Sequence, residues 1–402
     1  MREGRKLVTG KWQALVVIAL AELLAMSLWF SATAAAPELA DAWGLSAGQT
    51  AWLTMAVQLG FVAGALVSAV LTLSDTIEPR LFFAGSAVLG AGATVAIAAF
   101  VDSATPAIAL RFLTGMALAG VYPTGMKLMS GWFSDGRGVA IGTLVGALTV
   151  GSALPHLLRA VGGVGEPRAV LYGAAALALV GAVLVLFVGQ GPHQAPAAPF
   201  DPAAVGRMAR NSGVVLADFG YFGHMWELYA VWTWIPAFLL AAGVDPEAGA
   251  LLSFGTIAIG GAGAVVAGVG ADRAGRTTVT SASMVLSGAA CLTAGLVFDA
   301  PLVVLAPFVL LWGFVVVADS AQFSACVTEL AEESYVGTAL TLQTAVGFLL
   351  TVFSIRMVPL LADALGWQWA FAPLAVGPAL GTVAMLALRV RPEARQLAGG
   401  AR

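Results

Sequence analysis

Apolar residues along this chain form long runs, and most of the stretches between them are short and polar. A helix of roughly 20 predominantly apolar residues spans the hydrocarbon core of a bilayer. The pattern therefore predicts an all-α membrane protein with twelve transmembrane helices. They are placed at residues 13–36, 48–73, 80–101, 105–128, 138–160, 168–190, 212–240, 248–271, 277–298, 301–325, 336–360 and 367–389.

One connection, at residues 189–211, differs from the others because it is long and rich in Pro and polar residues. Such composition is typical of a linker. The sequence thus predicts a six-helix bundle at 1–188, the linker at 189–211, a second six-helix bundle at 212–390 and a tail at 391–402.

Composition supports a membrane environment, since 59% of the residues are hydrophobic and only 10% are charged. A typical soluble domain has about 25% charged residues. The basic start of the chain precedes an apolar run from Trp12 to Ala36, which is longer than the roughly 7–15 residues of a signal-peptide core. We expect this run to be retained as the first helix.

Positive charge indicates how the chain is oriented. If both ends are cytoplasmic, only Arg159 and Arg168 fall at or beyond the outer ends of helices, while Arg111 and Arg356 lie within them. The bias predicts cytoplasmic termini in a cell (inner) membrane. The basic residues assigned to that side are Arg2, Arg5, Lys6, Lys11, Arg80, Lys127, Arg137, Arg207, Arg210, Arg273, Arg276, Arg389, Arg391, Arg395 and Arg402.

The two halves match each other at a constant offset of 197 residues. Trp29 falls on Trp226, Asp75 on Asp272, and Arg159 on Arg356, and the same shift superimposes the predicted helices of the two halves from the first to the fifth. Since each half has six helices, the repeats have the same orientation in the membrane. Parallel repeats of this kind are a known transporter plan, with a solute site at the interface of the halves.

After the eighth predicted helix the chain reads Gly268-Val-Gly-Ala-Asp272-Arg273-Ala-Gly275-Arg276. This closely resembles the G-x-x-x-D-R-x-G-R signature of the major facilitator superfamily. A degraded first copy keeps Asp75, followed by Thr-Ile-Glu-Pro-Arg80. Arg111-Phe-Leu-Thr-Gly115 is similar to an R-x-x-x-G element of proton-coupled members.

The resemblance implies the major facilitator fold, with two parallel, pseudo-symmetric six-helix bundles that move by alternating access. It also implies that the loop motif latches the cytoplasmic face. Gly268 would allow close helix approach, and Asp272 would meet the N-terminus of a neighbouring helix. The alternative is that these charges only anchor the loop. The candidate gating residues are Asp75, Arg80, Gly268, Asp272, Arg273, Gly275 and Arg276.

Ionisable residues inside the predicted helices occur in the first, fourth, seventh and tenth, which the resemblance places around a central cavity. Charges at such depth are costly and usually functional. His224 and Glu227 are three residues apart, so we expect them to share a helix face and exchange a proton or a hydrogen bond. The alternative is a neutral His224 that donates to a backbone carbonyl, with Glu227 paired and without a role in transport. The candidate substrate and proton residues are Glu22, Trp29, Arg111, Tyr122, His224, Glu227, Tyr229, Asp319 and Gln322.

The sequence leaves a structural alternative open for these residues. A fixed contact between helices is as good an interpretation of Glu22 as a role in transport. Arg111 can extend to the outer surface instead of facing the cavity. Aromatic side chains such as Trp29 and Tyr229 are more often packing residues. Asp319 and Gln322 are predicted to line the inner part of the cavity.

Other residues are interpreted as structural. Tyr122 precedes a proline that we expect to bend the fourth helix. His156 is predicted to be structural, and Asp218 either pairs with a neighbour or acts. Gly60/Gly64 and Gly142/Gly146 predict close helix packing.

Several classes of function are disfavoured by missing motifs. The chain has no G-x-x-x-x-G-K-[ST] loop for ATP, no H-E-x-x-H and no G-x-S-x-G, and only three histidines and two cysteines. We expect a monomeric carrier of a small solute driven by protons, with no catalytic site, metal, cofactor or nucleic-acid partner. An exporter of drug-like compounds is the main alternative, although Ala147 replaces the Pro of the exporter G-x-x-x-G-P pattern. A channel or sensor is a further alternative.

Overall fold

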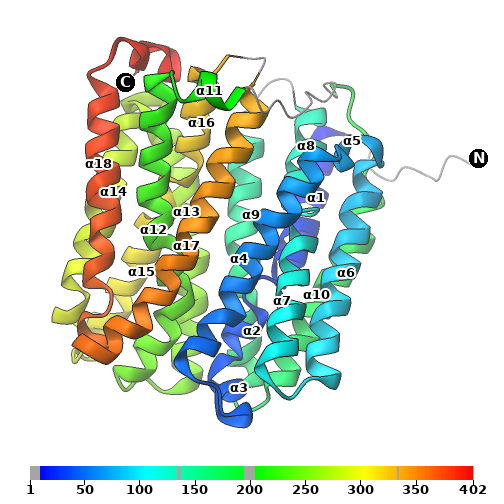
Figure 1. Ribbon diagram of the computed structural model, residues 1–402, viewed down its shortest axis with the longest axis vertical. Coiled ribbons are helices and arrows are strands. Elements are labelled where there is room, and N and C mark those ends of the chain that lie inside the picture. The colour runs from blue at the N-terminus through cyan, green and yellow to red at the C-terminus, as the bar shows by residue number, and fades with distance from the viewer. Residues whose placement is uncertain (1–9, 134–136, 194–203, 333–334, 402) are drawn as a thin grey trace, which may run out of the picture. The chain divides into compact units, whose positions relative to one another are not determined.

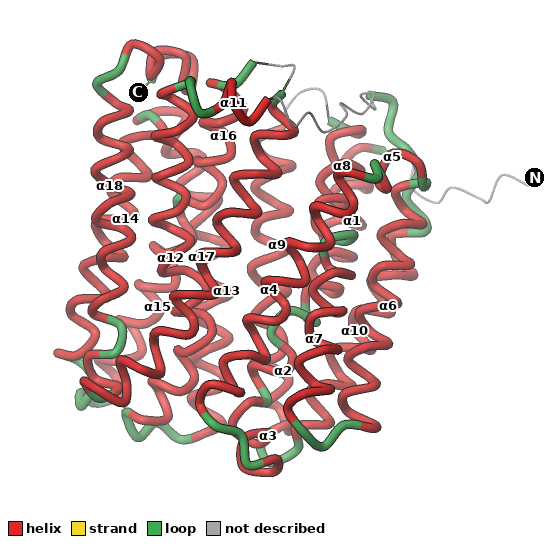
Figure 2. The backbone as a smooth tube through the Cα atoms, in the orientation of Figure 1, coloured by secondary structure: helices red, strands yellow, loops and turns green. Residues whose placement is uncertain are grey.

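A computed structural model describes residues 10–133, 137–193, 204–332 and 335–401. The side chains at positions 74, 75, 137, 138 and 204 are not described. Every regular element in the described residues is helical, and they contain no strand (Figure 1 and Figure 2). The prediction of an all-helical chain is therefore confirmed.

The chain divides into two compact units, Met1–Ala197 and Ala198–Arg402, and this boundary falls within the segment predicted as a linker. The helices of the first unit are α1 (Lys11–Met26), α2 (Ser31–Ala34), α3 (Ala36–Trp43), α4 (Ala47–Val70), α5 (Leu73–Thr76), α6 (Pro79–Phe100), α7 (Ala104–Leu118), α8 (Tyr122–Trp132), α9 (Arg137–Leu158), the π-helix η1 (Arg159–Gly163) and α10 (Pro167–Val185).

The helices of the second unit are α11 (Ala204–Met208), α12 (Ser212–Ala241), α13 (Pro246–Ala274), α14 (Arg276–Thr293), η2 (Ala294–Leu296), α15 (Leu302–Ala318), α16 (Ser320–Leu330), α17 (Val336–Leu365), η3 (Trp367–Trp369), η4 (Ala372–Ala375), α18 (Val376–Arg389) and η5 (Pro392–Gly400).

Helices pack in the same order within each unit. In the first unit, α1 packs against α9 and α10, α4 against α7, and α6 against α10. In the second unit, α12 packs against α17 and α18, α13 against α15, and α14 against α18. These are the same pairs of spans when counted from the start of each unit, which agrees with the repeat in the sequence.

Four of the predicted spans are interrupted, so the continuous helices predicted at 13–36, 105–128, 301–325 and 367–389 are wrong at these points, the last because η3 and η4 precede α18. The first span breaks between α1 and α2, the fourth between α7 and α8, and the tenth at Asp319 between α15 and α16. In the fourth span Pro123 lies in the first turn of α8, where its missing N–H is tolerated. The breaks in the fourth and tenth spans lie within three residues of each other in the repeat, since Asp319 corresponds to Tyr122, the first residue of α8.

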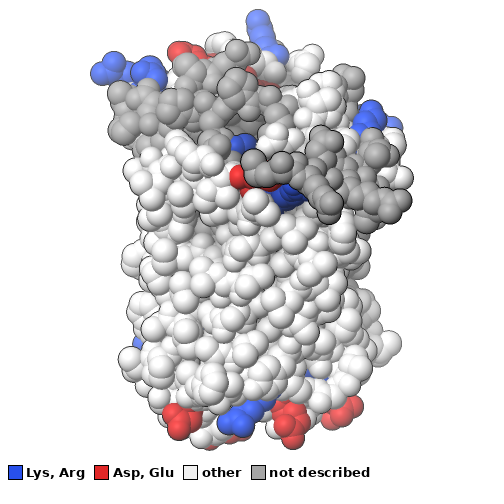
Figure 3. Space-filling model, turned by 90° about the vertical axis from the view of Figure 1, so that its right-hand side faces the viewer, with Lys and Arg blue, Asp and Glu red and all other residues white. Residues whose placement is uncertain are grey.

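Ten helical segments in the described residues are long and apolar enough to cross a membrane. The first predicted span is not among them, because the break leaves α1 with 16 residues. Nor is α12, which has 30 residues but carries Asp218, His224 and Glu227. On the face drawn in Figure 3, acidic and basic side chains gather at the two ends, and the surface between them is almost free of charge.

Glycines allow two of these helix pairs to touch through their backbones. A Cβ added at Gly60 would overlap Phe112 O of α7, and one at Gly64 would lie 2.6 Å from Met116 O. In the second unit a Cβ at Gly313 of α15 would overlap Thr256 O of α13. By contrast, a Cβ at Gly142 meets nothing within 4 Å. Close packing at Gly60/Gly64 is confirmed, whereas the prediction for Gly142 is wrong because α9 turns that position away from its neighbours.

We expect Gly313→Ala to destabilise the protein by roughly 1–3 kcal/mol, since the added methyl group overlaps a backbone carbonyl that cannot move alone. The matched control is Gly142→Ala, which has open space and gains up to about 1 kcal/mol of helix propensity. Thermal unfolding of the two purified variants in detergent measures the difference. Equal melting temperatures for both would contradict the close approach of α13 and α15.

Candidate functional site

A buried pair of titratable side chains lies in the second unit, where α12 faces the break between α15 and α16. His224 Nδ1 lies 2.9 Å from Asp319 Oδ1, and His224 Nε2 lies 2.8 Å from Ser320 Oγ. Both His224 and Asp319 are 1% exposed. Because Asp319 is the residue of the break and Ser320 begins α16, the interruption of the tenth span brings both groups to the imidazole.

Glu227 is buried one turn further along α12, but it does not contact His224 as predicted. Its Oε1 accepts a hydrogen bond of 2.5 Å from Ser287 Oγ, and its Oε2 accepts one of 3.3 Å from Cys291 Sγ. Both donors belong to α14. The predicted exchange between His224 and Glu227 is therefore wrong in this structure. Residues three apart on a helix differ by about 60° in direction, and here this difference points them at different neighbouring helices.

In the first unit Glu22 of α1 is completely buried beside the break in the fourth span. Its Oε2 lies 2.5 Å from the position that a Cβ at Gly125 would take, in the first turn of α8. Neither carboxyl oxygen has a hydrogen-bond partner among the described residues. Thr124 Oγ1, in the same turn, is also buried without a partner there. Tyr122, where α8 begins, is partly exposed.

Arg111 is completely buried within the first unit and does not reach the membrane surface. Its guanidinium donates to Leu53 O at 3.1 Å, to Leu28 O at 2.9 Å, to Ser31 Oγ at 3.2 Å and to Trp29 O. Three of these acceptors belong to the broken stretch of the first span. The interpretation as an arginine that extends to the outer surface is wrong, because these acceptors hold the guanidinium inside the unit.

The two aromatic candidates pack against other rings. The Trp29 ring lies 5.1 Å from that of Phe61, and the Tyr229 ring lies 5.1 Å from that of Phe348. Trp29 is 1% exposed and Tyr229 is 4% exposed. These contacts agree with the packing alternative for both residues.

The loop motif joins α13 to α14 through Gly275, whose φ of 94° lies in the region that favours glycine. Arg276 Nε donates to Glu329 Oε2 at 2.9 Å and Nη2 to Glu329 Oε1 at 2.5 Å, while Nη1 donates to Gln322 Oε1 at 2.7 Å. This fork-like pairing ties the start of α14 to α16. Gln322 thus accepts a hydrogen bond from Arg276, and its place in the wall of the inner cavity stays a prediction.

Other members of the motif make weaker contacts. A Cβ at Gly268 would find only Gln322 Nε2 at 3.9 Å, so the predicted close helix approach is wrong at this glycine. Asp272 and Arg273 are exposed. In the first copy, Arg80 pairs with Glu78 at 2.7 Å and donates to Leu186 O at 3.2 Å. The side chain of Asp75 lies outside the described residues.

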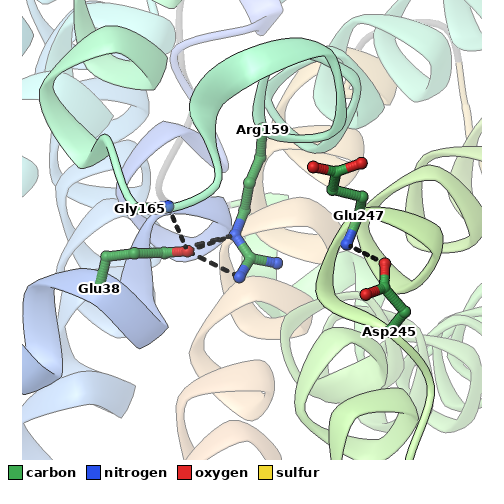
Figure 4. Close-up of polar contacts among 5 residues, drawn as sticks. All are labelled: Glu38, Arg159, Gly165, Asp245 and Glu247. Carbon is green, nitrogen blue, oxygen red and sulfur yellow. Dashed lines mark hydrogen bonds and ion pairs between the residues drawn. The ribbon is translucent and has the colours of Figure 1, made fainter.

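An ion pair that the sequence did not predict joins α3 to η1 in the first unit. Arg159 donates to Glu38 through Nε at 3.0 Å and Nη2 at 2.7 Å, and the backbone N–H of Gly165 also points to this carboxylate (Figure 4). In the second unit Asp245 Oδ1 accepts from the N–H of Glu247 at 3.0 Å and caps α13 (Figure 4).

Comparison with known proteins gives these sites their context. A family model described as Major Facilitator Superfamily matches residues 18–355 and 217–402. The chain belongs to the major facilitator superfamily. Both the predicted superfamily and its fold are confirmed. No curated protein matches the chain.

Three solved structures of superfamily members share the fold. The nucleoside transporter NupG is 14% identical, with a TM-score of 0.73 over 93% of this chain and 99% of that one. A bacterial homologue of the human lysosomal transporter Spinster is 13% identical, with a TM-score of 0.71 over 96% and 97%. The proton:xylose symporter XylE is 14% identical, with a TM-score of 0.73 over 94% and 95%. At these identities the similarity shows the fold alone.

Membership in the superfamily makes this chain a multi-pass membrane transporter of a small molecule. Its members are transporters and not enzymes. Within the described residues no group of three or more His, Cys, Asp or Glu side chains could hold a metal ion.

Sequence reasoning missed four hydrogen-bonding partners, three of them partners of candidate residues and one the partner of Arg159. Ser287 and Cys291 are four apart on one face of α14, and a polar pair at this spacing in an apolar helix was the available signal. Glu329 follows the tenth predicted span and is an obvious partner for the basic loop motif once the fold is assumed. Glu38 gave no signal, because only the fold brings it to Arg159.

Proposed function

We propose that this superfamily member is a proton-coupled secondary transporter that works by alternating access between its two six-helix halves. We place it in the cell membrane with both termini in the cytoplasm, because fifteen Lys and Arg residues fall on that side and two on the other. The observation that carries the proposal is the contact between His224 and Asp319, beside the separately buried Glu227.

Buried titratable groups of this kind suit a proton carrier. A charged imidazole or carboxylate inside a membrane span is costly unless it is paired. His224 Nδ1 and Asp319 Oδ1 lie 2.9 Å apart, so a proton can move between the two groups, as an ion pair or as two neutral groups, with no change in the net charge of the pair. Glu227 has hydroxyl and thiol donors but no cation within hydrogen-bonding distance among the described residues, so taking up a proton removes an uncompensated buried charge.

The solute must be found before coupling is measured. The first step is a thermal-shift screen of purified protein, because a ligand that binds the folded form raises its apparent stability. The panel should include nucleosides and sugars, since NupG and XylE are named as transporters of such compounds, together with organic cations and anions. Compounds that raise the melting temperature then serve in transport assays.

We expect Glu227→Gln to abolish accumulation driven by a proton gradient in proteoliposomes and to leave counterflow exchange partly intact. The introduced amide can still accept a hydrogen bond from Ser287 but cannot take up a proton. The control is Glu247→Gln, which makes the same charge change at an exposed position of the same unit. If driven accumulation by Glu227→Gln equals that of the wild type, Glu227 is not the coupling residue. Conduction without counterflow in the wild type would indicate a channel.

A further inference from the structure

The segment Pro392–Gly400, which the sequence predicted only as part of a tail, is folded onto the second unit. It forms 3-10 turns that are interrupted from Leu397 to Gly399. Ala394 and Leu397 have no exposed surface, while Arg395 and Gln396 between them are exposed. The segment packs against α16, α13 and α18. The two buried side chains therefore anchor it, in the manner of a short amphipathic element.

Two hydrogen bonds fix the ends of this segment. The backbone N–H of Ala398 donates to Glu329 Oε2 at 3.0 Å. Ser212 Oγ, at the start of α12, donates to Glu393 Oε1 at 2.9 Å. A hydrogen bond from its own backbone N–H, and then the one from Ser212, lower the pKa of Glu393 from its ordinary value. The segment thus bridges the start of α12 and the end of α16.

Glu329 is the carboxylate that also holds Arg276 of the loop motif. Its Oε2 accepts from both Arg276 Nε and the Ala398 N–H, and its Oε1 accepts from Arg276 Nη2. A carboxylate in the right orientation accepts two hydrogen bonds from one guanidinium. The backbone N–H of Ala398 holds the Glu329 carboxylate in that orientation. The motif, α16 and the folded segment therefore share one set of hydrogen bonds.

The backbone conformation of Ala398 indicates that its hydrogen bond to Glu329 is part of a defined fold of this segment. Its φ of 47° is left-handed, and among the described residues only Thr72 is another non-glycine residue with positive φ. Alanine adopts this conformation at a cost, so surrounding contacts must compensate for it. Here the buried Leu397 and the bond to Glu329 are the contacts that do so.

We propose that Pro392–Gly400 is a positioning element of the loop motif, which holds Glu329 in the orientation that clamps Arg276. When the segment is docked, the start of α14 is fixed to the end of α16. When it leaves, Glu329 loses its third donor and this end of the unit opens more often. The proposal concerns the second unit alone and does not depend on proton coupling.

Cys326 provides a reporter inside the protein itself. It lies on α16 one turn before Glu329 and has no exposed surface. The other cysteine, Cys291, is buried beside Glu227 on α14, so peptide mapping after labelling distinguishes the two. The experiment measures the rate at which N-ethylmaleimide labels Cys326 in the purified full-length chain. Since the thiol must be uncovered to react, this rate follows local opening.

Position 398 offers a matched pair of variants. Ala398→Pro removes the N–H and cannot adopt a positive φ, whereas Ala398→Gly keeps the N–H and adopts that φ freely. We expect Ala398→Pro to label Cys326 about tenfold faster than the wild type, and Ala398→Gly to label it no faster. Leu397→Asp, which removes the buried anchor, should behave like Ala398→Pro, and Gln396→Ala should behave like the wild type.

A double variant tests whether the segment acts through Glu329. In a Glu329→Ala background, Ala398→Pro should add nothing further to the labelling rate, because the acceptor of the amide is already gone. Unchanged labelling in both Ala398→Pro and Leu397→Asp would overturn the proposal. An equal acceleration by Ala398→Pro with and without Glu329 would also overturn it, since the segment would then act by another route.

Discussion

Replacing Arg111 with methionine is expected to destabilise the protein by about 3 kcal/mol or more. Hydrogen bonds to a charged donor are worth roughly 1.5–3 kcal/mol each. Arg111 makes four of them, all buried. Removing an arginine charge from the membrane interior offsets part of this loss. The rest of the loss arises because Leu28 O and Trp29 O lose their donor, and both lie between α1 and α2, where the first span has no regular helix.

The measurement is the melting temperature of the purified variant in detergent, which we expect to fall by roughly 5 °C or more. Arg111→Lys should lie between the wild type and Arg111→Met, since an ammonium group cannot reproduce the fork of the guanidinium. Arg356→Met is the control, because Arg356 is the other arginine within a predicted span but is partly exposed and makes no hydrogen bond within the described residues. A loss as large for Arg356→Met would show that the carbonyl contacts of Arg111 carry no special weight.

Much of the fold could be predicted from the sequence, because the lipid environment leaves few alternatives. Apolar runs of this length must be helices, since no other local structure satisfies the backbone in lipid. The repeat and the loop motif then identified the superfamily. The sequence also identified polar side chains that are buried, such as Glu22, His224 and Glu227, because ionisable residues are rare inside an apolar helix.

The partners of these side chains could not be predicted, because they depend on the rotation of each helix about its axis. His224 and Glu227 were expected to face each other, yet a rotation of about 60° sends one to Asp319 and the other to Ser287. Gly60/Gly64 and Gly142 look alike in sequence, and only the rotation decides which face a neighbour. The sequence marked the break in the fourth span with Pro123, but it gave no such mark for the first, which has no proline or glycine between Ser27 and Phe30.

The largest coupling between two side chains is expected for His224 and Asp319. Their ring and carboxylate atoms lie 2.9 Å apart with almost no exposed surface. Removing one member leaves the other as a buried polar group without this partner, which costs roughly 1–3 kcal/mol, and more for a charged group. We therefore expect His224→Ala and Asp319→Ala each to lower the free energy of unfolding by about 3 kcal/mol.

The double variant decides whether these losses share one cause. If the pair acts as a unit, the variant that lacks both side chains should be little worse than either single variant, giving a coupling of about 2 kcal/mol or more. Glu227→Ala combined with His224→Ala is the comparison, since these side chains contact different helices and their effects should nearly add. Additive losses for His224 and Asp319 would mean that their contact contributes nothing to the free energy of unfolding. A proton that moves between the two side chains would then have no effect on α15 and α16.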